Sequence, residues 1–211
     1  MARACLLAIA FVFATPAPVR ADATRTQAAM EEYFAGEQRG GFVLVGMGGA
    51  GLAAGGLLYA EGSDTAKGAS YPLLGIGLAH VAAGIFVHVS SSRRIHKFRD
   101  QITKDSRAFV TVERPRMKGV STQFFVLKIA EVALIAGGLT MAGIGHETER
   151  PQLKGAGIAL AAELAATLVF DIVAARRAHR YRAALGALDV QAGIDPLTGG
   201  PIAFLVHRGR F

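Results

Sequence analysis

Residues 40–60 read GGFVLVGMGGAGLAAGGLLYA and contain no charged side chain. A helix that packs in a water-soluble protein needs one polar face, and this run is apolar on every side. Glycine in a helix costs about 1 kcal/mol relative to alanine in water, whereas in lipid the backbone must satisfy its own hydrogen bonds and the helix forms regardless. The run therefore predicts a helix that spans a membrane.

Three further runs of similar length, at 71–89, 124–145 and 153–175, are apolar and contain almost no charged side chains. Each is about 20 residues long, which at 1.5 Å per residue is enough to cross a hydrocarbon core of about 30 Å. Only 18% of the chain is charged, whereas about a quarter is usual in water-soluble domains. We therefore predict an all-α membrane protein with four transmembrane helices. A water-soluble bundle of very apolar helices is the alternative.

The start of the chain predicts a secretory signal peptide over residues 1–21. Arg3 supplies a short basic region, Leu6–Ala14 supplies an apolar region, and small residues before Asp22 and Thr24 offer two cleavage sites. An uncleaved anchor is the alternative. The chain's one cysteine, Cys5, lies in this segment. A mature chain would therefore hold no disulfide, thiol nucleophile or cysteine-ligated metal.

The predicted spans divide the rest of the chain into two helical hairpins and three polar segments. The expected order is a polar interfacial helix over 22–39, a first hairpin over 40–102, a basic connector over 103–123, a second hairpin over 124–187 and a tail over 188–211. Pro115 should break any helix between Ser90 and Thr122. A turn at Asp195–Gly200 follows a β-like run at Leu188–Ala192 and precedes another, which predicts a short β-hairpin-like C-terminal tail.

The two hairpins are expected to be copies of one unit. A shift of 83 residues places the motif R-R-x-H-[KR]-[FY]-R of residues 93–99 on residues 176–182. The same shift aligns Phe-Val-Leu at 42–44 with Phe-Val-Leu at 125–127. We therefore predict two tandem-repeated hairpins. Each copy has an even number of spans, so both should insert the same way up.

Pairs of small residues four positions apart let membrane helices approach closely. They occur at Gly51 and Gly55 in the first span, Ala79 and Ala83 in the second, and Ala162 and Ala166 in the fourth. These pairs predict close helix contacts, and the same Gly/Ala faces could carry a homo-oligomer.

Two signals disagree about membrane sidedness. Between Ser90 and Thr122 there are nine Lys or Arg residues and three acids, and the positive-inside rule places such a segment in the cytoplasm. A cleaved signal peptide would export residues 22–39 instead, and two spans later the basic segment would also lie outside. The expected location is the cytoplasmic (inner) membrane of a bacterium, as a multi-pass protein, with its sidedness open.

Six ionisable residues within the predicted spans form a polar ladder. They are His80 and His88 in the second span, Lys128 and Glu131 in the third, and Glu163 and Asp171 in the fourth. Unpaired ionisable groups are costly in lipid, so we expect the ladder to face the bundle interior. Pairs such as Lys128–Asp171 and His80–Glu163 would fix the helix register, and a proton, cation or metal path is the alternative. No metal ligand or cofactor is assigned, because His80 and His88 lie two turns apart and cannot share one ion.

The repeated basic motif lies where the second and fourth spans end. Its cations complement helix C-termini, and Phe98 and Tyr181 are expected in an aromatic belt at the interface. We expect eight basic side chains to contact anionic lipid headgroups, at about 1 kcal/mol each. They are Arg93, Arg94, Lys97, Arg99, Arg176, Arg177, Arg180 and Arg182. These flanking charges account for the net charge of +7 without a nucleic-acid partner.

Residues Gly46–Gly51 match the dinucleotide-binding pattern G-x-G-x-x-G. The segment after them is apolar on all sides and leads into another span, whereas a dinucleotide site needs an amphipathic helix and further βα units. The sequence also lacks a phosphate loop with Lys, a Gly-x-Ser-x-Gly and a His-Glu-x-x-His. We therefore expect a non-enzymatic structural or interaction protein of the membrane. A small ion, proton or metal transporter that uses the polar ladder is the alternative.

Overall fold

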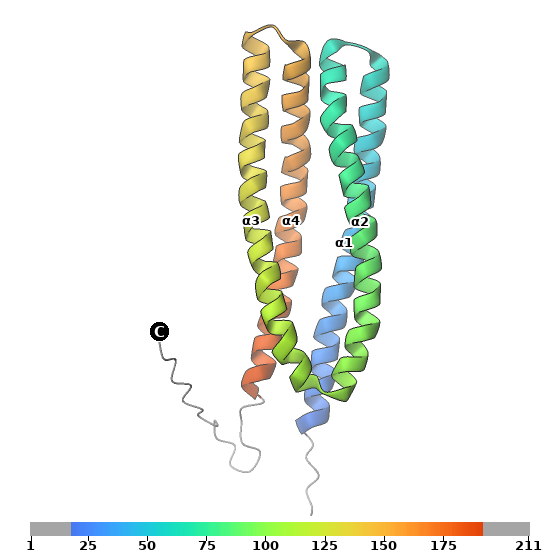
Figure 1. Ribbon diagram of the computed structural model, residues 1–211, viewed down its shortest axis with the longest axis vertical. Coiled ribbons are helices and arrows are strands. Elements are labelled where there is room, and N and C mark those ends of the chain that lie inside the picture. The colour runs from blue at the N-terminus through green and yellow to red at the C-terminus, as the bar shows by residue number, and fades with distance from the viewer. Residues whose placement is uncertain (1–17, 192–211) are drawn as a thin grey trace, which may run out of the picture.

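The computed structural model describes residues 18–191, and describes side chains over residues 23–186. Four long helices joined by short turns make up this part of the chain (Figure 1). They are α1 (Pro18–Glu61), α2 (Asp64–Lys104), α3 (Ser106–Glu147) and α4 (Pro151–Gln191). The predicted all-helical architecture with four helices is confirmed for the described residues.

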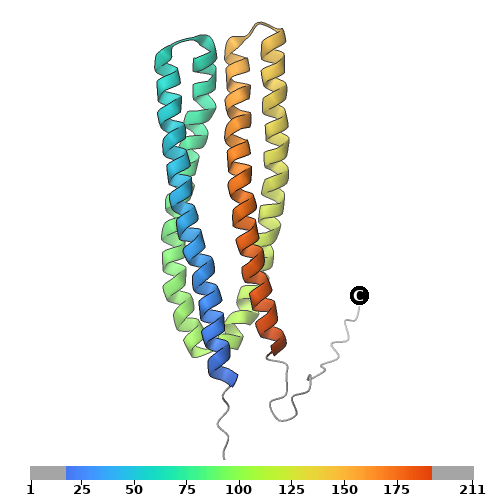
Figure 2. The same ribbon diagram turned by 180° about the vertical axis from the view of Figure 1, so that it is seen from behind.

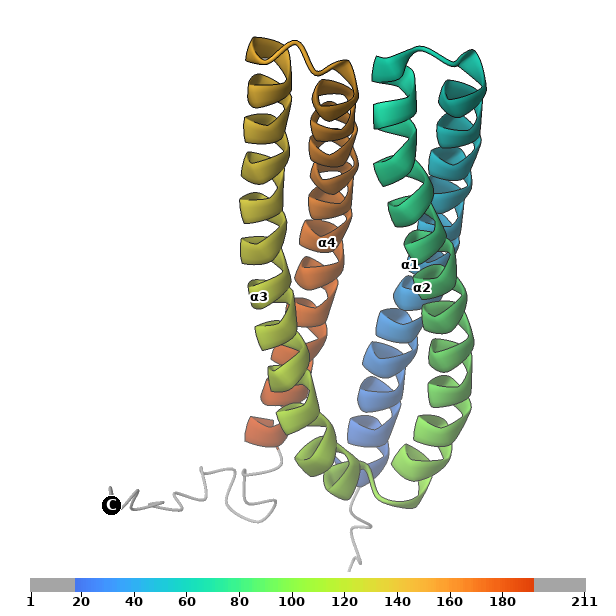
Figure 3. The ribbon, with the colours of Figure 1, turned by 45° about the horizontal axis from the view of Figure 1, so that its top comes forward.

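The helices form two antiparallel hairpins, α1 with α2 and α3 with α4 (Figure 2). Both hairpins point the same way, with their turns at one end, while the α2–α3 link and both ends of the described chain lie at the other. Figure 3 shows the hairpins side by side, and the parallel helices α2 and α4 form the main contact between them. This common direction is the one expected of two copies, but the duplication itself stays a prediction.

Local chemistry explains how the helices end. Gly62 has a φ of 88°, a left-handed conformation that glycine adopts without a steric penalty. The Ser63 hydroxyl then accepts a hydrogen bond from the backbone N–H of Ala66 and caps α2. The Asp105 carboxylate accepts from the backbone N–H groups of Arg107 and Ala108, both at 3.0 Å, and caps α3. Asp105 is the single residue between the end of α2 and the start of α3.

The helices are about twice as long as a membrane is thick. Each has 41 to 44 residues, or about 60 Å, against a hydrocarbon core of about 30 Å. The apolar runs occupy the end nearer the two turns, which we call the membrane half. The other end, which we call the stalk, comprises residues 23–39 of α1, 90–104 of α2, 106–123 of α3 and 176–186 of α4. Residues 22–39, expected as an interfacial helix, are thus continuous with the first span.

The prediction that Pro115 breaks the helix in the basic segment is wrong. Pro115 lies inside α3. Its ring nitrogen cannot donate to the carbonyl of Thr111, but both residues are exposed, so water can reach that carbonyl. On either side of the proline, Phe109 and Met117 are buried against the other helices. This packing holds the helix together across the missing hydrogen bond.

In the membrane half, the helices of each hairpin meet through glycines. Gly41 and Gly48 of α1 face Gly84 and Gly77 of α2 so closely that a Cβ on any of the four would overlap the opposite backbone. The corresponding pair in the second hairpin is Gly138 and Gly157. The glycines of the first hairpin recur every seven residues, the spacing at which antiparallel helices keep one seam in contact.

The predicted pairs of small residues fall into two classes. Gly51 and Gly55 face α2, as expected. The alanine pairs at 79 and 83 and at 162 and 166 are exposed on the outer surface. Buried glycines, rather than these alanines, therefore make the close contacts within the described chain, and self-association through the alanines stays a prediction.

The outer surface of the membrane half is apolar. Large side chains such as Phe42, Leu57 and Phe86 are 64%, 73% and 69% exposed. A water-soluble protein rarely exposes large contiguous apolar patches. All four helices are long and apolar enough to cross a membrane. The fold is therefore that of a multi-pass membrane protein, surrounded by lipid along this half.

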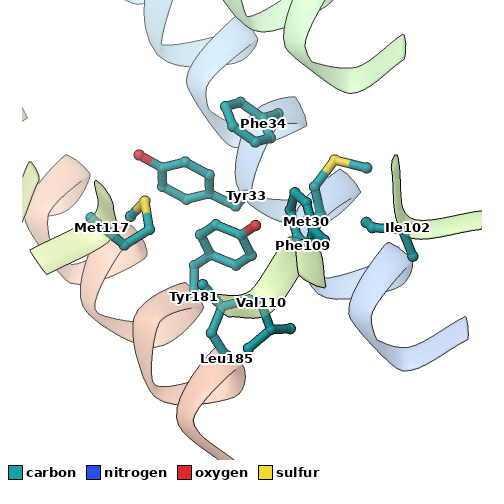
Figure 4. Close-up of a cluster of buried hydrophobic side chains, with 10 residues drawn as sticks. Met30, Tyr33, Phe34, Ile102, Phe109, Val110, Met117, Tyr181 and Leu185 are labelled. Atoms are coloured by element: carbon teal, nitrogen blue, oxygen red, sulfur yellow. The ribbon is translucent and has the colours of Figure 1, made fainter. Parts of the chain in front are cut away.

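The stalk has a core of its own, to which all four helices contribute (Figure 4). Its members are Met30, Tyr33, Phe34, Ile102, Phe109, Val110, Met117, Ala178, Tyr181 and Leu185. Tyr181 is only 3% exposed, and Phe98 packs edge-on against Phe34 at 5.5 Å between ring centroids. The expectation of an aromatic belt is therefore wrong for Tyr181, because four amphipathic helix ends bury it inside the protein.

Two predictions concern the ends of the chain. Helix α1 begins at Pro18, so most of the predicted signal peptide lies outside the described residues and stays a prediction. Helix α4 continues to Gln191. The β-like run predicted at Leu188–Ala192 is therefore wrong for residues 188–191. Extending an existing helix needs no new nucleation, which favours helix over an isolated strand. The rest of the tail lies outside the described residues.

Candidate functional site

Three residues of the polar ladder meet in the interior of the membrane half. His80 of α2 and Glu131 of α3 are 7% and 6% exposed, and Asp171 of α4 is half-buried. Glu131 precedes the buried Gly138 by seven residues, and Asp171 precedes the buried Ala178 by seven. Both carboxyl groups therefore occupy the seam along which α3 and α4 pack.

Thr167 of α4 holds the His80 ring. Its hydroxyl oxygen lies 3.1 Å from Nε2 of His80, and the hydroxyl donates to the carbonyl of Glu163 at 2.9 Å. Because a hydroxyl has one hydrogen, it can donate in only one of these two contacts, and the direction of the His80–Thr167 hydrogen bond depends on the tautomer of the ring. Nδ1 of His80 is buried without a hydrogen-bond partner in the described part of the chain.

The carboxyl groups of Glu131 and Asp171 lie side by side. Asp171 also interacts electrostatically with His80 and Lys128. Oε2 of Glu131 is buried and has no hydrogen-bond partner among the described residues. We call His80, Glu131, Thr167 and Asp171 the polar cluster, with Lys128 at its edge.

Neither pair suggested from the sequence forms as a direct contact. Lys128 is half-buried and interacts electrostatically with Asp171, but it forms no ion pair within the described residues. His80 reaches Glu163 only through the Thr167 hydroxyl and a backbone carbonyl. The structure therefore joins Glu131 to Asp171 and His80 to Thr167, a residue that the sequence did not single out.

The Glu163 carboxylate lies against α1. A Cβ on Gly51 would stand 2.7 Å from Glu163 Oε1, so a larger residue there would require the carboxylate to move. His88 is separate from the polar cluster, because its ring packs on Phe42 with 4.4 Å between centroids. The ladder is thus divided into one central cluster and two flanking residues.

The polar cluster has the chemistry to hold and exchange a proton. Two adjacent carboxylates repel each other, and this repulsion is reduced when the pair shares a proton. The imidazole of His80 is a second group that binds protons reversibly. Across the described residues, no three His, Cys, Asp or Glu side chains come together as a metal site.

A groove of about 550 Å³ opens between α3 and α4, where the membrane half meets the stalk. We call it the α3–α4 groove. It is lined by Ser121, Phe124, Phe125 and Lys128 of α3, and by Ile172, Ala175, Arg176, His179 and Arg180 of α4. Two of the eight predicted headgroup-binding residues, Arg176 and Arg180, therefore share one concave site with Lys128.

The other predicted headgroup-binding residues have different environments. Arg99 forms an ion pair with Glu31 at 2.8 Å, and Arg177 donates to the backbone carbonyl of Gly36. Arg93 and Lys97 are exposed, while Arg94 and Arg182 are half-buried. Arg99 and Arg177 thus bind partners within the protein, which reduces their availability to lipid.

The sequence did not reveal a buried ion pair in the stalk. Arg116 Nη2 and Nε donate to the two oxygens of Glu113 at 2.5 and 2.6 Å, and Glu113 is 2% exposed. The guanidinium carbon lies 5.7 Å from the ring centroid of Phe34 and 5.9 Å from that of Phe98. The spacing of an acid and a base three residues apart was the available signal, and Pro115 between them favoured a loop instead.

No family model, curated protein or solved structure matches the chain. The polar cluster, the α3–α4 groove and the stalk are therefore the features from which a function can be proposed.

Proposed function

We propose that the protein is a non-enzymatic structural and interaction protein of the membrane. The observation that carries this proposal is the unbroken passage of all four helices from an apolar membrane half into a stalk with its own core. Such a fold anchors one half in lipid and holds the other in water at a fixed distance from the bilayer.

The packing supports a role in holding a shape. Glycine contacts bring the helices of each hairpin together in the membrane half. Buried aromatic rings hold the same helices together in the stalk, where Arg116 of α3 lies over the rings of Phe34 of α1 and Phe98 of α2. On this proposal the polar cluster sets the register of α2, α3 and α4, which is the common use of buried polar groups in helix bundles.

The proposed partners are the lipid bilayer, anionic headgroups at the basic boundary, and macromolecules that bind the stalk. Exposed cations such as Arg93 and Lys97 stand near the end of the apolar run of α2. Each such charge contributes about 1 kcal/mol of attraction to an anionic surface. Homo-oligomers would form through the exposed alanine faces.

A specific observation favours proton transfer as a second candidate function. Glu131 and Asp171 lie side by side, and the buried Nδ1 of His80 lacks a partner in the described residues. Lys128 connects this cluster to the α3–α4 groove. Groups of this kind inside a membrane often form proton relays.

One experiment separates the two functions. The full chain is reconstituted in liposomes that contain a pH-sensitive dye, and proton entry is followed after an imposed pH difference and potential. The structural proposal expects the same flux as liposomes without protein, and expects Glu131→Gln with Asp171→Asn to alter thermal stability alone. A flux that this double variant abolishes, with unchanged thermal stability, would establish the proton path and overturn the structural role.

A further inference from the structure

The α3–α4 groove combines a basic rim with an apolar wall. Lys128, Arg176 and Arg180 bring three cations to one concavity, and His179 adds an imidazole. Phe125 and Ile172 line the same space with apolar surface. The three cations form no ion pair with any residue in the part of the chain that the structure describes. Their charge is therefore available to an anion from outside the protein.

The apolar wall continues from the groove onto the lipid-facing surface. Phe125 is 62% exposed, and Ile129 and Val132 follow it along α3 with 56% and 55% exposure. Val169 is 64% exposed on α4, on the side of Ile172 that leads into the membrane half. A molecule with an anionic end and a hydrocarbon end would fit the basic rim of the groove and the apolar surface that continues from it.

The matching positions of the first hairpin carry different side chains. Under the 83-residue shift, Lys128 corresponds to Val45, and Ser121 and Ala175 correspond to Gln38 and Ser92. The amide of Gln38 donates to the Ser92 hydroxyl at 2.8 Å and bridges α1 to α2 there. Of the cations, Arg93 and Lys97 remain as the counterparts of Arg176 and Arg180. The two pairs have matching charge, and Arg176 and Arg180 line the α3–α4 groove together with Lys128.

We propose that the α3–α4 groove binds one anionic phospholipid from the surrounding bilayer. Its phosphate lies among Lys128, Arg176 and Arg180, and an acyl chain follows Phe125 and Ile129. Arginine donates two parallel hydrogen bonds to a phosphate, and a lysine ammonium at the edge of the apolar region extends toward the headgroups. This inference rests on the proposed membrane location and narrows the general attraction of lipid headgroups to one site.

The test uses the purified full chain in detergent, incubated with equal amounts of phosphatidylglycerol and phosphatidylcholine and analysed by native mass spectrometry. The wild type should retain one phosphatidylglycerol in preference to phosphatidylcholine. Arg176→Gln with Arg180→Gln should lower the affinity for phosphatidylglycerol about tenfold or more. The comparison variant, Arg93→Gln with Lys97→Gln, removes the same charge at the bilayer surface outside the groove, and should lower the affinity for phosphatidylglycerol by a smaller factor than the Arg176/Arg180 variant does. Lys128→Met should weaken binding, and Lys128→Arg should preserve it.

Three results would overturn the proposal. Equal losses in the Arg176/Arg180 and Arg93/Lys97 variants would show diffuse attraction without a groove. Equal retention of the two lipids would remove the role of charge. Displacement of the lipid by millimolar inorganic phosphate would assign the site to free phosphate. None of these results depends on the proton flux measured in liposomes, which tests the proposed function separately.

Discussion

The ring of Tyr33 in α1 stacks on the ring of Tyr181 in α4, with centroids 4.7 Å apart and planes 11° from parallel. Burial raises the pKa of both phenols, so both stay neutral. The stack joins the first and last helices at the stalk end, where Figure 4 shows it surrounded by Met117 and Leu185. It therefore closes the bundle across the two hairpins.

Tyr181→Ala should destabilise the protein by about 3 kcal/mol, because it removes a buried aromatic ring from the stalk core. Tyr181→Phe keeps the stack and should cost less than about 1 kcal/mol. Tyr59→Ala is the control, since Tyr59 is 53% exposed. Thermal unfolding in detergent measures all three. A loss for Tyr59→Ala as large as for Tyr181→Ala would contradict the existence of a separate stalk core.

Arg116→Met should destabilise by about 2 kcal/mol, because Glu113 would stay buried without its cation. The full effect of a buried pair is reduced here, since the Arg116 side chain is 29% exposed. Adding Glu113→Leu should recover most of the loss. Lys118→Met, at an exposed position nearby, should change the unfolding free energy by less than about 0.5 kcal/mol. If the double variant is no better than Arg116→Met, the pair is not coupled.

Gly48→Ala should destabilise by about 2 kcal/mol, because the new methyl group would overlap the Gly77 backbone. Gly49→Ala is the matched control: its Cβ would meet no atom within 4 Å, so it should change the unfolding free energy by less than about 0.5 kcal/mol. Of the two neighbouring substitutions, only Gly48→Ala should therefore destabilise the protein. Similar thermal shifts for both would exclude the glycine seam between α1 and α2.

Lys128→Met should destabilise the wild type by about 1 kcal/mol, because the ammonium attracts the Asp171 carboxyl group across the cluster edge. In an Asp171→Asn background the same substitution should cost less than about 0.5 kcal/mol. A double-mutant cycle on proteolysis or thermal unfolding gives the coupling. Equal costs in the two backgrounds would show that Lys128 interacts with water or lipid alone.

Both hairpin turns should react from one side of the membrane and the α2–α3 link from the other. With Cys5→Ser as background, Ser63→Cys and Glu149→Cys should be labelled together by a membrane-impermeant thiol reagent. Lys104→Cys should be labelled only from the opposite side, because each helix crosses the membrane once. Labelling of all three from one side would refute the four spans. The side of Lys104→Cys also decides between the positive-inside rule and the exported N-terminus.

The spans could be predicted from sequence because lipid imposes one simple requirement. A run such as residues 40–60, long enough and apolar on all sides, has few other stable environments. The common direction of the two hairpins could also be predicted, because each hairpin contains two spans and the chain therefore returns to the same side of the membrane. The glycine seam could be predicted only in part. The sequence has both alanines and glycines at helical spacing, and the packing of the helices decides which of them are buried.

The stalk could not be predicted because its apolar positions are separated by many charges. Val110, Met117 and Phe124 recur every seven residues along α3, but Pro115 lies among them and pointed to a loop. The side-chain contacts between different helices could not be predicted from the sequence either. Nothing in the spacing of Glu131 or His80 identifies Asp171 or Thr167 as the neighbour, because that depends on how far each helix is shifted along the next.

Each helix runs without a break from the membrane half into the stalk, so a movement at one end of a helix also moves its other end. Each is about 60 Å long, since 41 or more residues rise 1.5 Å apiece. A change of about 5° in the tilt of one helix relative to its neighbours would move its far end by about 5 Å. Lateral pressure in the bilayer, or a load on the stalk, would in this way be transmitted mechanically between the two ends without any chemical step.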